Sequence, residues 1–222
     1  MKRVMDVEIV VVRQRRKSIS ARVIDLDTIE IRVPWFTSQT MIEEFIDRKR
    51  DRLAKLLLEY QRKESRKLDP RYYYLGKAYT QVCVKSTRDH VSFQEDTVCI
   101  EYSSKSAADV LESFTRNEAK RLLEQCLREC MVLFPSLSKP ILQVRKMRTR
   151  WGSCAYRKSK ITLNSKLVHV PYLCIQYVVV HELLHFYYPD HQKRFHQELE
   201  KIIPDHRKVE KMLQEYGFLL EV

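Results

Sequence analysis

Two histidines separated by three residues carry the clearest potential for chemistry in this sequence. The segment His181-Glu182-Leu183-Leu184-His185 has the pattern HExxH. Residues four apart lie on the same face of a helix, so both imidazoles can bind one metal ion. Glu182 is turned about 100° from His181 on that helix, which brings it near a metal-bound water without making it a ligand. We therefore predict a metal site in which Glu182 acts as the general base.

A catalytic zinc site needs a third protein ligand and leaves the fourth position to water. His191 follows His185 by six residues, and this HExxHxxxxxH spacing is the one seen in metzincins. Glu198 and His196, on the next predicted helix, are the alternatives. We favour His181, His185 and His191 as the ligands of a Zn²⁺ ion.

The residues around the motif predict that its helix is buried. From about Tyr172 to Tyr187, apolar side chains lie on every side of the helix. Two imidazoles and a carboxylate in such a helix are costly unless a metal ion or another partner compensates for their burial. The alternative is that the three polar residues meet solvent at one exposed edge.

The elements that must position this helix follow from hydrophobic periodicity. Strands are expected at 141–146 and 160–164 before it, and helices at 191–203 and 205–216 after it. The strand at 160–164 is either an exposed edge able to bind an extended peptide or an ordinary strand inside a sheet.

The upstream part of the chain is predicted to be rich in strands. These are expected at 4–12, 19–25, 28–33, 72–75, 80–85, 91–93 and 98–102, and a long helix spans 106–134. A further helix begins near Thr40, where Thr40 and Glu43 have the spacing of a capping box. The mixture of strands and helices predicts an α+β protein.

Three segments together resemble the YgjP-like metal-dependent hydrolase family, within the wider SprT and WLM group of zincins. They are Arg150-Trp151-Gly152-Ser153-Cys154, then 161–164, then 177–185 with His191 and Phe195. The resemblance implies a zincin-like core, with the active-site helix on a small mixed sheet, preceded by a β-rich lobe with long helices. It implies zinc on His181, His185 and His191, with Glu182 as the base. The sequence departs from the family at His196, where Trp is usual.

On this basis we expect two parts. Residues 1–104 form the N-terminal β-rich lobe with one long helix, and residues 105–222 form the zincin-like hydrolase domain. The two are expected to make one compact unit.

Glycine is scarce, and its placement excludes some phosphate-binding loops. Gly76, Gly152 and Gly217 are the only glycines and lie far apart. A Walker loop or a GxGxxG fingerprint needs clustered glycines. Any phosphate recognition would therefore come from Arg and Lys side chains.

The formal net charge is +12, and part of the excess lies directly before the metal motif. No acidic residue occurs between Cys130 and His181, where the basic residues are Lys139, Arg145, Lys146, Arg148, Arg150, Arg157, Lys158, Lys160 and Lys166. We name Arg148, Arg150 and Asn164 as candidate substrate-binding residues. This basic strip also makes nucleic acid a possible partner.

Three functions fit these features. A zinc metallopeptidase would hydrolyse peptide bonds in a peptide or protein. A nucleotide pyrophosphatase would bind triphosphates through Arg and Lys, although such enzymes more often use Mg²⁺ on carboxylates. A nucleic-acid-binding module with a metal site would use the basic strip and Tyr72–Tyr74, but Glu182 argues against a purely structural metal. We favour the metallopeptidase.

The location of the protein is predicted from its cysteines and its apolar runs. The first residues lack the uncharged core of a secretory signal, and the longest charge-free apolar run, 167–180, is too short to span a membrane. Six cysteines without a CxxC pair do not form a disulfide framework in a chain of this length. We expect a cytoplasmic protein with reduced thiols and no membrane partner.

Overall fold

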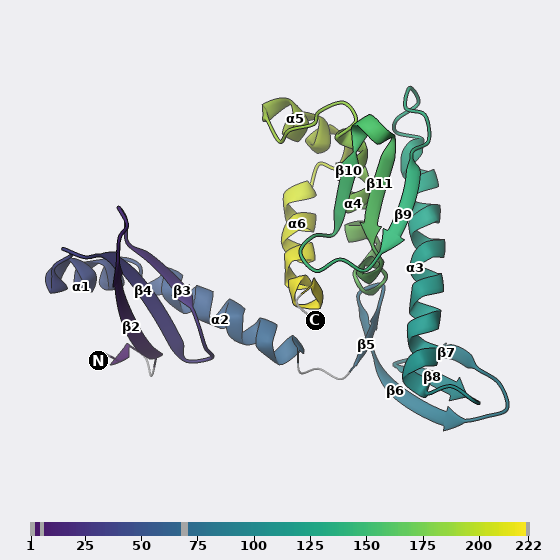
Figure 1. Cartoon of the computed structure of the whole chain (residues 1–222), viewed down its shortest axis with the longest axis horizontal. Helices are drawn as coiled ribbons and strands as arrows, with labels where there is room; N and C mark the ends of the chain where they lie inside the picture. The colour runs from purple at the N-terminus through teal and green to yellow at the C-terminus, as the bar shows by residue number, and fades with distance from the viewer. Residues whose placement is uncertain (1–2, 5–6, 68–70, 221–222) are drawn as a thin grey trace. The chain divides into compact units, whose positions relative to one another are not determined.

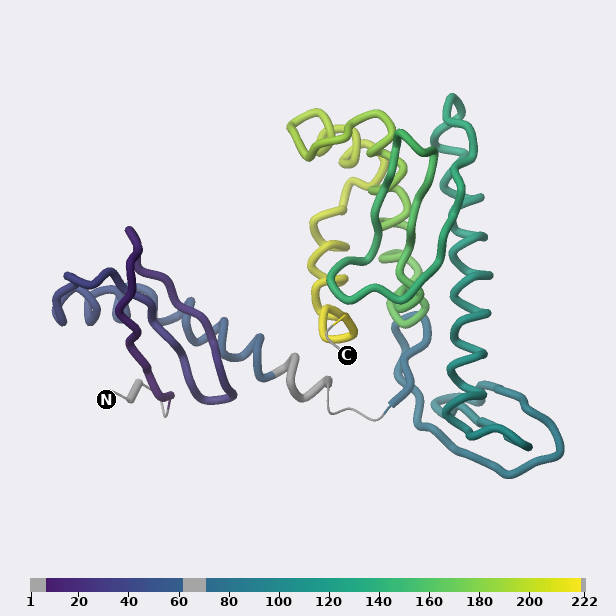
Figure 2. Tube along the Cα trace, viewed as in Figure 1, coloured from purple at the N-terminus to yellow at the C-terminus, as the bar shows by residue number. Residues whose placement is uncertain are grey.

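The computed structural model describes residues 3–4, 7–67 and 71–220, and it is a mixture of helices and small sheets (Figure 1). Contacts divide the chain into two compact units, Met1–Asp69 and Pro70–Val222. The tube in Figure 2 follows the sheet and helices of the first unit and then those of the second. The α+β class predicted from the sequence is confirmed.

The first unit is a four-stranded sheet with two helices. Its elements are β1 (Arg3–Val4), β2 (Val7–Gln14), β3 (Ser20–Val23), β4 (Thr28–Pro34), α1 (Gln39–Arg48) and α2 (Arg50–Lys67). The strand order is β1-β2-β4-β3, with β2 and β4 parallel and the outer strands antiparallel to their neighbours. The three predicted strands are present, although Met5 and Asp6 of the first lie outside the described residues.

The long helix predicted from Thr40 is instead two helices. Ser38 is the N-cap, because its backbone is extended (φ −69°, ψ 158°) and its hydroxyl accepts a hydrogen bond from Met41 N at 3.2 Å. Thr40 therefore already lies inside α1, and the predicted capping box is wrong. The first helix ends at Arg48, and its C-cap residue Lys49 has a φ of −109° and a ψ of 10°, which interrupt the helix before Arg50.

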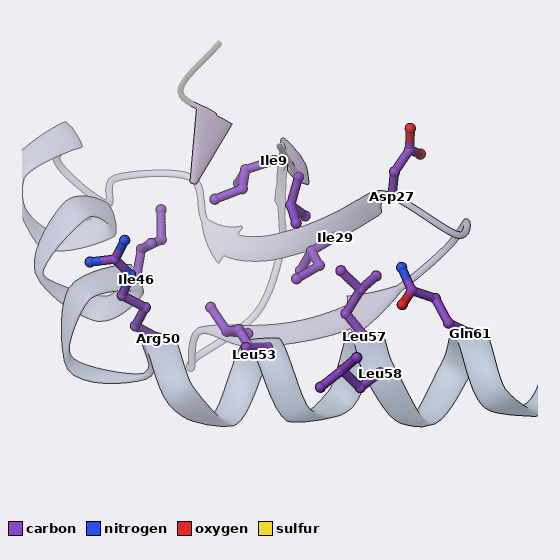
Figure 3. A pocket seen from close by; sticks show the side chains of 11 residues that line it. Ile9, Asp27, Ile29, Ile46, Arg50, Leu53, Leu57, Leu58 and Gln61 are labelled. Carbon is purple, nitrogen blue, oxygen red and sulfur yellow. The ribbon is translucent and has the colours of Figure 1, made fainter. Parts of the chain in front are cut away.

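An apolar core joins the sheet of this unit to its helices. Ile31 and Val33 of β4 are fully buried. A cavity of about 370 Å³ lies between the strands and α2. Figure 3 shows Ile29 on the strand side of this cavity and Leu53 and Leu57 on the helix side.

The second unit begins with another four-stranded sheet. Its strands are β5 (Tyr72–Tyr74), β6 (Lys77–Lys85), β7 (His90–Gln94) and β8 (Thr97–Tyr102), in the order β5-β6-β8-β7, and α3 (Ala107–Met131) follows. Val98 and Ile100 are buried with Val110 of α3 in one apolar cluster. Because these strands pack on α3, the observed division falls at 69/70, whereas the sequence analysis placed it at 104/105.

The tyrosine triplet belongs to this packing. Tyr72 is buried, and the hydroxyl of Tyr74 donates a 2.7 Å hydrogen bond to Glu118 on α3. Burial also raises the pKa of Tyr72 to about 12. Tyr72 and Tyr74 therefore hold β5 to α3 and are not exposed for stacking on nucleic-acid bases.

A smaller three-stranded sheet lies in the last third of the chain. It consists of β9 (Ile141–Arg145), β10 (Gly152–Ala155) and β11 (Lys160–Asn164), in the order β10-β11-β9. β11 is antiparallel to β10 and parallel to β9, so the sheet is mixed, as the resemblance implied. Since β11 is the central strand and four of its residues are buried, the interpretation of 160–164 as an exposed edge is wrong.

Helix α4 (Tyr172–Leu184) packs against this sheet and is the most enclosed helix of the unit. It contacts β10, β11 and α3, and also α5 (Lys193–Ile202) and α6 (His206–Glu215). Val179 and Leu183 are fully buried, as predicted from the apolar sequence. Within the described part of the chain, no helix combines the length and apolar character needed to cross a bilayer.

Candidate active site

The HExxH segment lies at the C-terminal end of α4. The helix ends at Leu184 rather than at the predicted Tyr187, but His185 still has helical backbone angles (φ −64°, ψ −13°). Tyr187 N and Tyr188 N both donate to Leu184 O and close the last turn before Pro189. His181 and His185 therefore remain on one helical face while the chain turns back.

This turn brings His191 to the two helical histidines. One ligand atom from each of His181, His185 and His191 lies within 4.8 Å of the others. The ring centroids of His181 and His185 are 4.9 Å apart, and those of His185 and His191 are 4.7 Å apart. His191 Nε2 and His181 Nε2 are separated by 2.9 Å. The three imidazoles thus converge on one point.

Phe195 supports all three imidazoles. Its ring is fully buried, and its centroid lies 4.9 Å from those of His181 and His185 and 4.8 Å from that of His191. Sequence reasoning gave this residue no role beyond its place in the family-like segment. The strong amphipathicity of its short helix was the available signal.

The state of the histidine rings suits a metal ion. Burial, together with the nearby imidazoles of His185 and His191, lowers the pKa of His181 to about 3, so its ring is neutral at neutral pH. His185 Nδ1 lies 3.0 Å from Tyr188 O, and as a donor to this carbonyl it leaves Nε2 free for a ligand bond. His181 Nδ1 is buried and has no hydrogen-bond partner among the residues that the structure describes. Three imidazoles are a donor set that fits Zn²⁺.

Glu182 lies beside this cluster in a tight site. The residue is 6% exposed, and burial raises the pKa of its carboxyl to about 7 while Arg150 opposes the shift. Strand β10 passes so close that a Cβ atom at Gly152 would lie 2.5 Å from Glu182 Oε1 and 2.8 Å from its Cγ. Only glycine leaves the carboxyl in this position.

The alternative third ligands lie elsewhere. Glu198 forms an ion pair with Lys201 at 2.7 Å. His196 is exposed, and its ring centroid lies 6.5 Å from that of His191. Neither belongs to the cluster of converging donors.

Of the three candidate substrate-binding residues, Arg150 lies nearest the cluster. It lines a cavity of about 300 Å³ together with His181, Glu182 and the α6 residues Glu210 and Gln214. This cavity gives the site an opening to solvent beside the buried carboxyl.

Asn164 has a different role from the one predicted. It is fully buried, its Nδ2 donates to Met147 O and Arg150 O at 2.9 Å, and its Oδ1 accepts from Met147 N and Lys166 N. A substrate cannot reach this amide, so its prediction as a substrate-binding residue is wrong. Asn164 instead fixes the backbone of the loop that carries Arg148 and Arg150.

The chain thus combines an α+β fold, a buried helix on a mixed sheet and three convergent imidazoles at the end of that helix, which is the arrangement of a candidate metal site. The family model of the YgjP-like, metallopeptidase domain matches residues 17–216. The chain belongs to this family, which makes it a metallohydrolase of the peptidase type. No curated protein matches it.

Among solved structures, the chain is similar to two archaeal metallopeptidase zymogens. The jannalysin zymogen of Methanocaldococcus jannaschii is 19% identical with a TM-score of 0.38, and the match covers 42% of this chain and 88% of that chain. The abylysin zymogen of Pyrococcus abyssi is 19% identical with a TM-score of 0.39, and the match covers 41% of this chain and 90% of that chain. Likenesses of this strength bear on neither the substrate nor the site.

Proposed function

We propose that this chain is a zinc-dependent metallopeptidase, with His181, His185 and His191 as zinc ligands and Glu182 as the general base. The observation that carries the proposal is the convergence of three imidazoles, one of which, His181, lines a cavity together with the buried carboxyl of Glu182. Zn²⁺ held by three protein ligands supplies a water nucleophile activated near neutral pH.

The residues of the chain have separate tasks in this proposal. The bond from His185 Nδ1 to Tyr188 O orients the imidazole, and Phe195 fixes the planes of the three rings. Glu182 accepts a proton on its carboxylate and transfers it to the leaving amine. Arg150, in the wall of the same cavity, binds the substrate.

The second candidate function is a metal-dependent nucleotide pyrophosphatase. One observation favours it: Arg148 and Arg150 have exposed side chains on a loop beside the site and form no ion pair with the described residues. The imidazole donor set counts against it, because phosphate chemistry more often uses Mg²⁺ on carboxylates.

A substrate panel tests the proposal. The zinc content of the purified chain is measured, and wild type and Glu182→Gln are incubated with unstructured proteins and with nucleoside triphosphates. We expect one zinc per chain, cleavage of proteins, and loss of cleavage in the variant with zinc retained. Absence of bound zinc contradicts the proposal. Hydrolysis of triphosphates alone, lost in the variant, makes the pyrophosphatase correct, and nucleic-acid binding without any turnover supports a binding module.

A further inference from the structure

A second cavity, of about 380 Å³, adjoins the candidate active site and is lined by cations. It lies along the loop between β9 and β10, with Arg145, Lys146, Arg148 and Arg150 in its wall. Ser153 of β10, next to Gly152, completes the lining. Arg150 is shared with the cavity that contains His181 and Glu182, so the two cavities meet at this side chain.

The four cations of this wall, Arg145, Lys146, Arg148 and Arg150, have no ion-pair partner among the described residues, and only Arg150 acts on a nearby carboxyl, that of Glu182. Their side chains are exposed and make no hydrogen bond or ion pair with any described residue. Burial and the charges of Lys146 and Arg148 lower the pKa of the neighbouring Lys166. Like charges held this close are unfavourable in the absence of an anion.

The loop backbone that carries these cations is held in place. Met147, in the middle of the loop, is buried, and Asn164 bonds both the N–H and the carbonyl of Met147 and the carbonyl of Arg150. A fixed backbone reduces the cost of ordering the side chains when a ligand binds. The arrangement is that of a prepared anion site.

We propose that this basic cavity binds acidic side chains of the peptide substrate, next to the peptide bond that is cleaved. The inference rests on the proposed function and adds a substrate class, namely peptides with Asp or Glu clustered on one side of the scissile bond. Arg and Lys bind carboxylates through charge-assisted hydrogen bonds. Because Arg150 belongs to both cavities, a bound acidic segment extends directly to Glu182.

The first measurement is binding without turnover. Zinc-loaded Glu182→Gln is titrated with labelled peptides that share one central sequence and carry four Glu, four Gln or four Lys on either flank. We expect the Glu peptide to bind at least about tenfold more tightly than the Gln peptide, with a preference that weakens as salt is added. Equal binding of the Glu and Gln peptides overturns the inference.

Matched double variants locate the site. In the Glu182→Gln background, Arg145→Gln with Arg148→Gln removes two cations from the cavity, and Lys120→Gln with Arg128→Gln removes two exposed cations from α3. We expect about a tenfold loss of Glu-peptide binding for the first pair only. An equal loss for both pairs means that net charge alone attracts the peptide, and it overturns the inference.

Turnover by wild type separates this inference from the proposed function. Faster cleavage of the Glu peptide supports both, and cleavage without preference overturns the inference alone. Selective binding with no cleavage of any peptide supports the basic cavity and contradicts the peptidase. Displacement of the Glu peptide by a nucleoside triphosphate that the wild type then hydrolyses assigns the cavity to phosphate and overturns the inference.

Discussion

Two buried glutamates, one in each unit, have opposite surroundings. Glu30 in the first unit is 9% exposed and accepts hydrogen bonds from Arg22, at 2.8 Å, and from Arg32. The bonds from Arg22, and then those from Arg32, lower its pKa. Glu182 in the second unit is 6% exposed, has no ion pair with a described residue, and has its pKa raised to about 7 by burial.

The cavities of the two units also differ in the chemical character of their lining side chains. The cavity of the first unit is lined mainly by aliphatic side chains such as Ile29, Leu53 and Leu57 (Figure 3). The cavity beside α4 is lined by His181 and Glu182 among other polar residues. A buried charge that is paired and hydrogen-bonded is tolerated in a fold, whereas one without a paired charge costs stability and is typical of a functional site. The cluster of converging imidazoles and the buried carboxyl with a raised pKa both lie in the second unit.

The largest expected effect follows from removing one imidazole of the cluster. We expect His185→Ala to lose its zinc and, with it, all measurable turnover, because two remaining ligands hold the ion weakly. Metal analysis after dialysis measures the loss. His196→Ala is the matched control, since that exposed ring lies outside the cluster, and it should keep both zinc and activity. Zinc retained by His185→Ala would contradict the ligand assignment.

The next effect tests the contrast between the glutamates directly. Glu182→Gln should lower turnover by about 10²- to 10⁴-fold while zinc content is unchanged. Its metal-free form should be at least as stable as wild type, because a neutral amide replaces a buried carboxyl without a charged partner. Glu30→Gln, in contrast, should lower the melting temperature and leave turnover unchanged, because it removes the charge that pairs with Arg22 and Arg32. Equal loss of stability in both variants would break the comparison.

A smaller effect is expected from crowding the carboxyl of Glu182. In the wild-type structure, Glu182 Oε1 lies 2.5 Å from the position that a Cβ atom of residue 152 would take. The methyl group of Gly152→Ala therefore displaces this oxygen. We expect kcat to fall about 10- to 100-fold with zinc retained, since misplacement by about 1 Å is enough for such losses. Gly217→Ala is the control, because nothing lies within 4 Å of its added carbon. An unchanged kcat in Gly152→Ala would show that this contact does not position Glu182.

The features predicted well from the sequence depend on local spacing. The pairing of His181 with His185 follows from helical periodicity, and the burial of α4 follows from its continuous apolar composition. The approach of His191 required a turn whose position Pro189 indicates. Each of these relations lies within a single short stretch of the chain, between Tyr172 and His191.

The features that were missed depend on contacts between distant parts of the chain. Gly152 and Glu182 are thirty positions apart, and nothing in either segment indicates that they touch. The central place of β11 follows from its pairing with both β9 and β10, which its own sequence does not specify. Asn164 was predicted from its place in the family-like segment 161–164, whereas its hydrogen bonds are made to the loop around Met147.

The smallest expected effect concerns the pH dependence of the first unit. The folded-state pKa of Glu30 lies below its ordinary value of 4.5, so the unfolded chain binds the proton more tightly. The stability that Glu30 contributes is therefore present above about pH 4.5 and is lost as pH falls through the lowered folded-state pKa.

Thermal unfolding of wild type and Glu30→Gln between neutral pH and about pH 3 measures this contribution. We expect the difference in melting temperature between wild type and Glu30→Gln to narrow as the pH falls. Protonation removes the negative charge of Glu30 from wild type, and the variant lacks that charge at every pH. Glu112→Gln is the control, since Glu112 pairs with Arg116 while both side chains are more than two-thirds exposed, and such pairs contribute little. A difference that stays constant with pH would mean that Glu30 stabilises by packing and not by charge, and the contrast with Glu182 would then rest on burial alone.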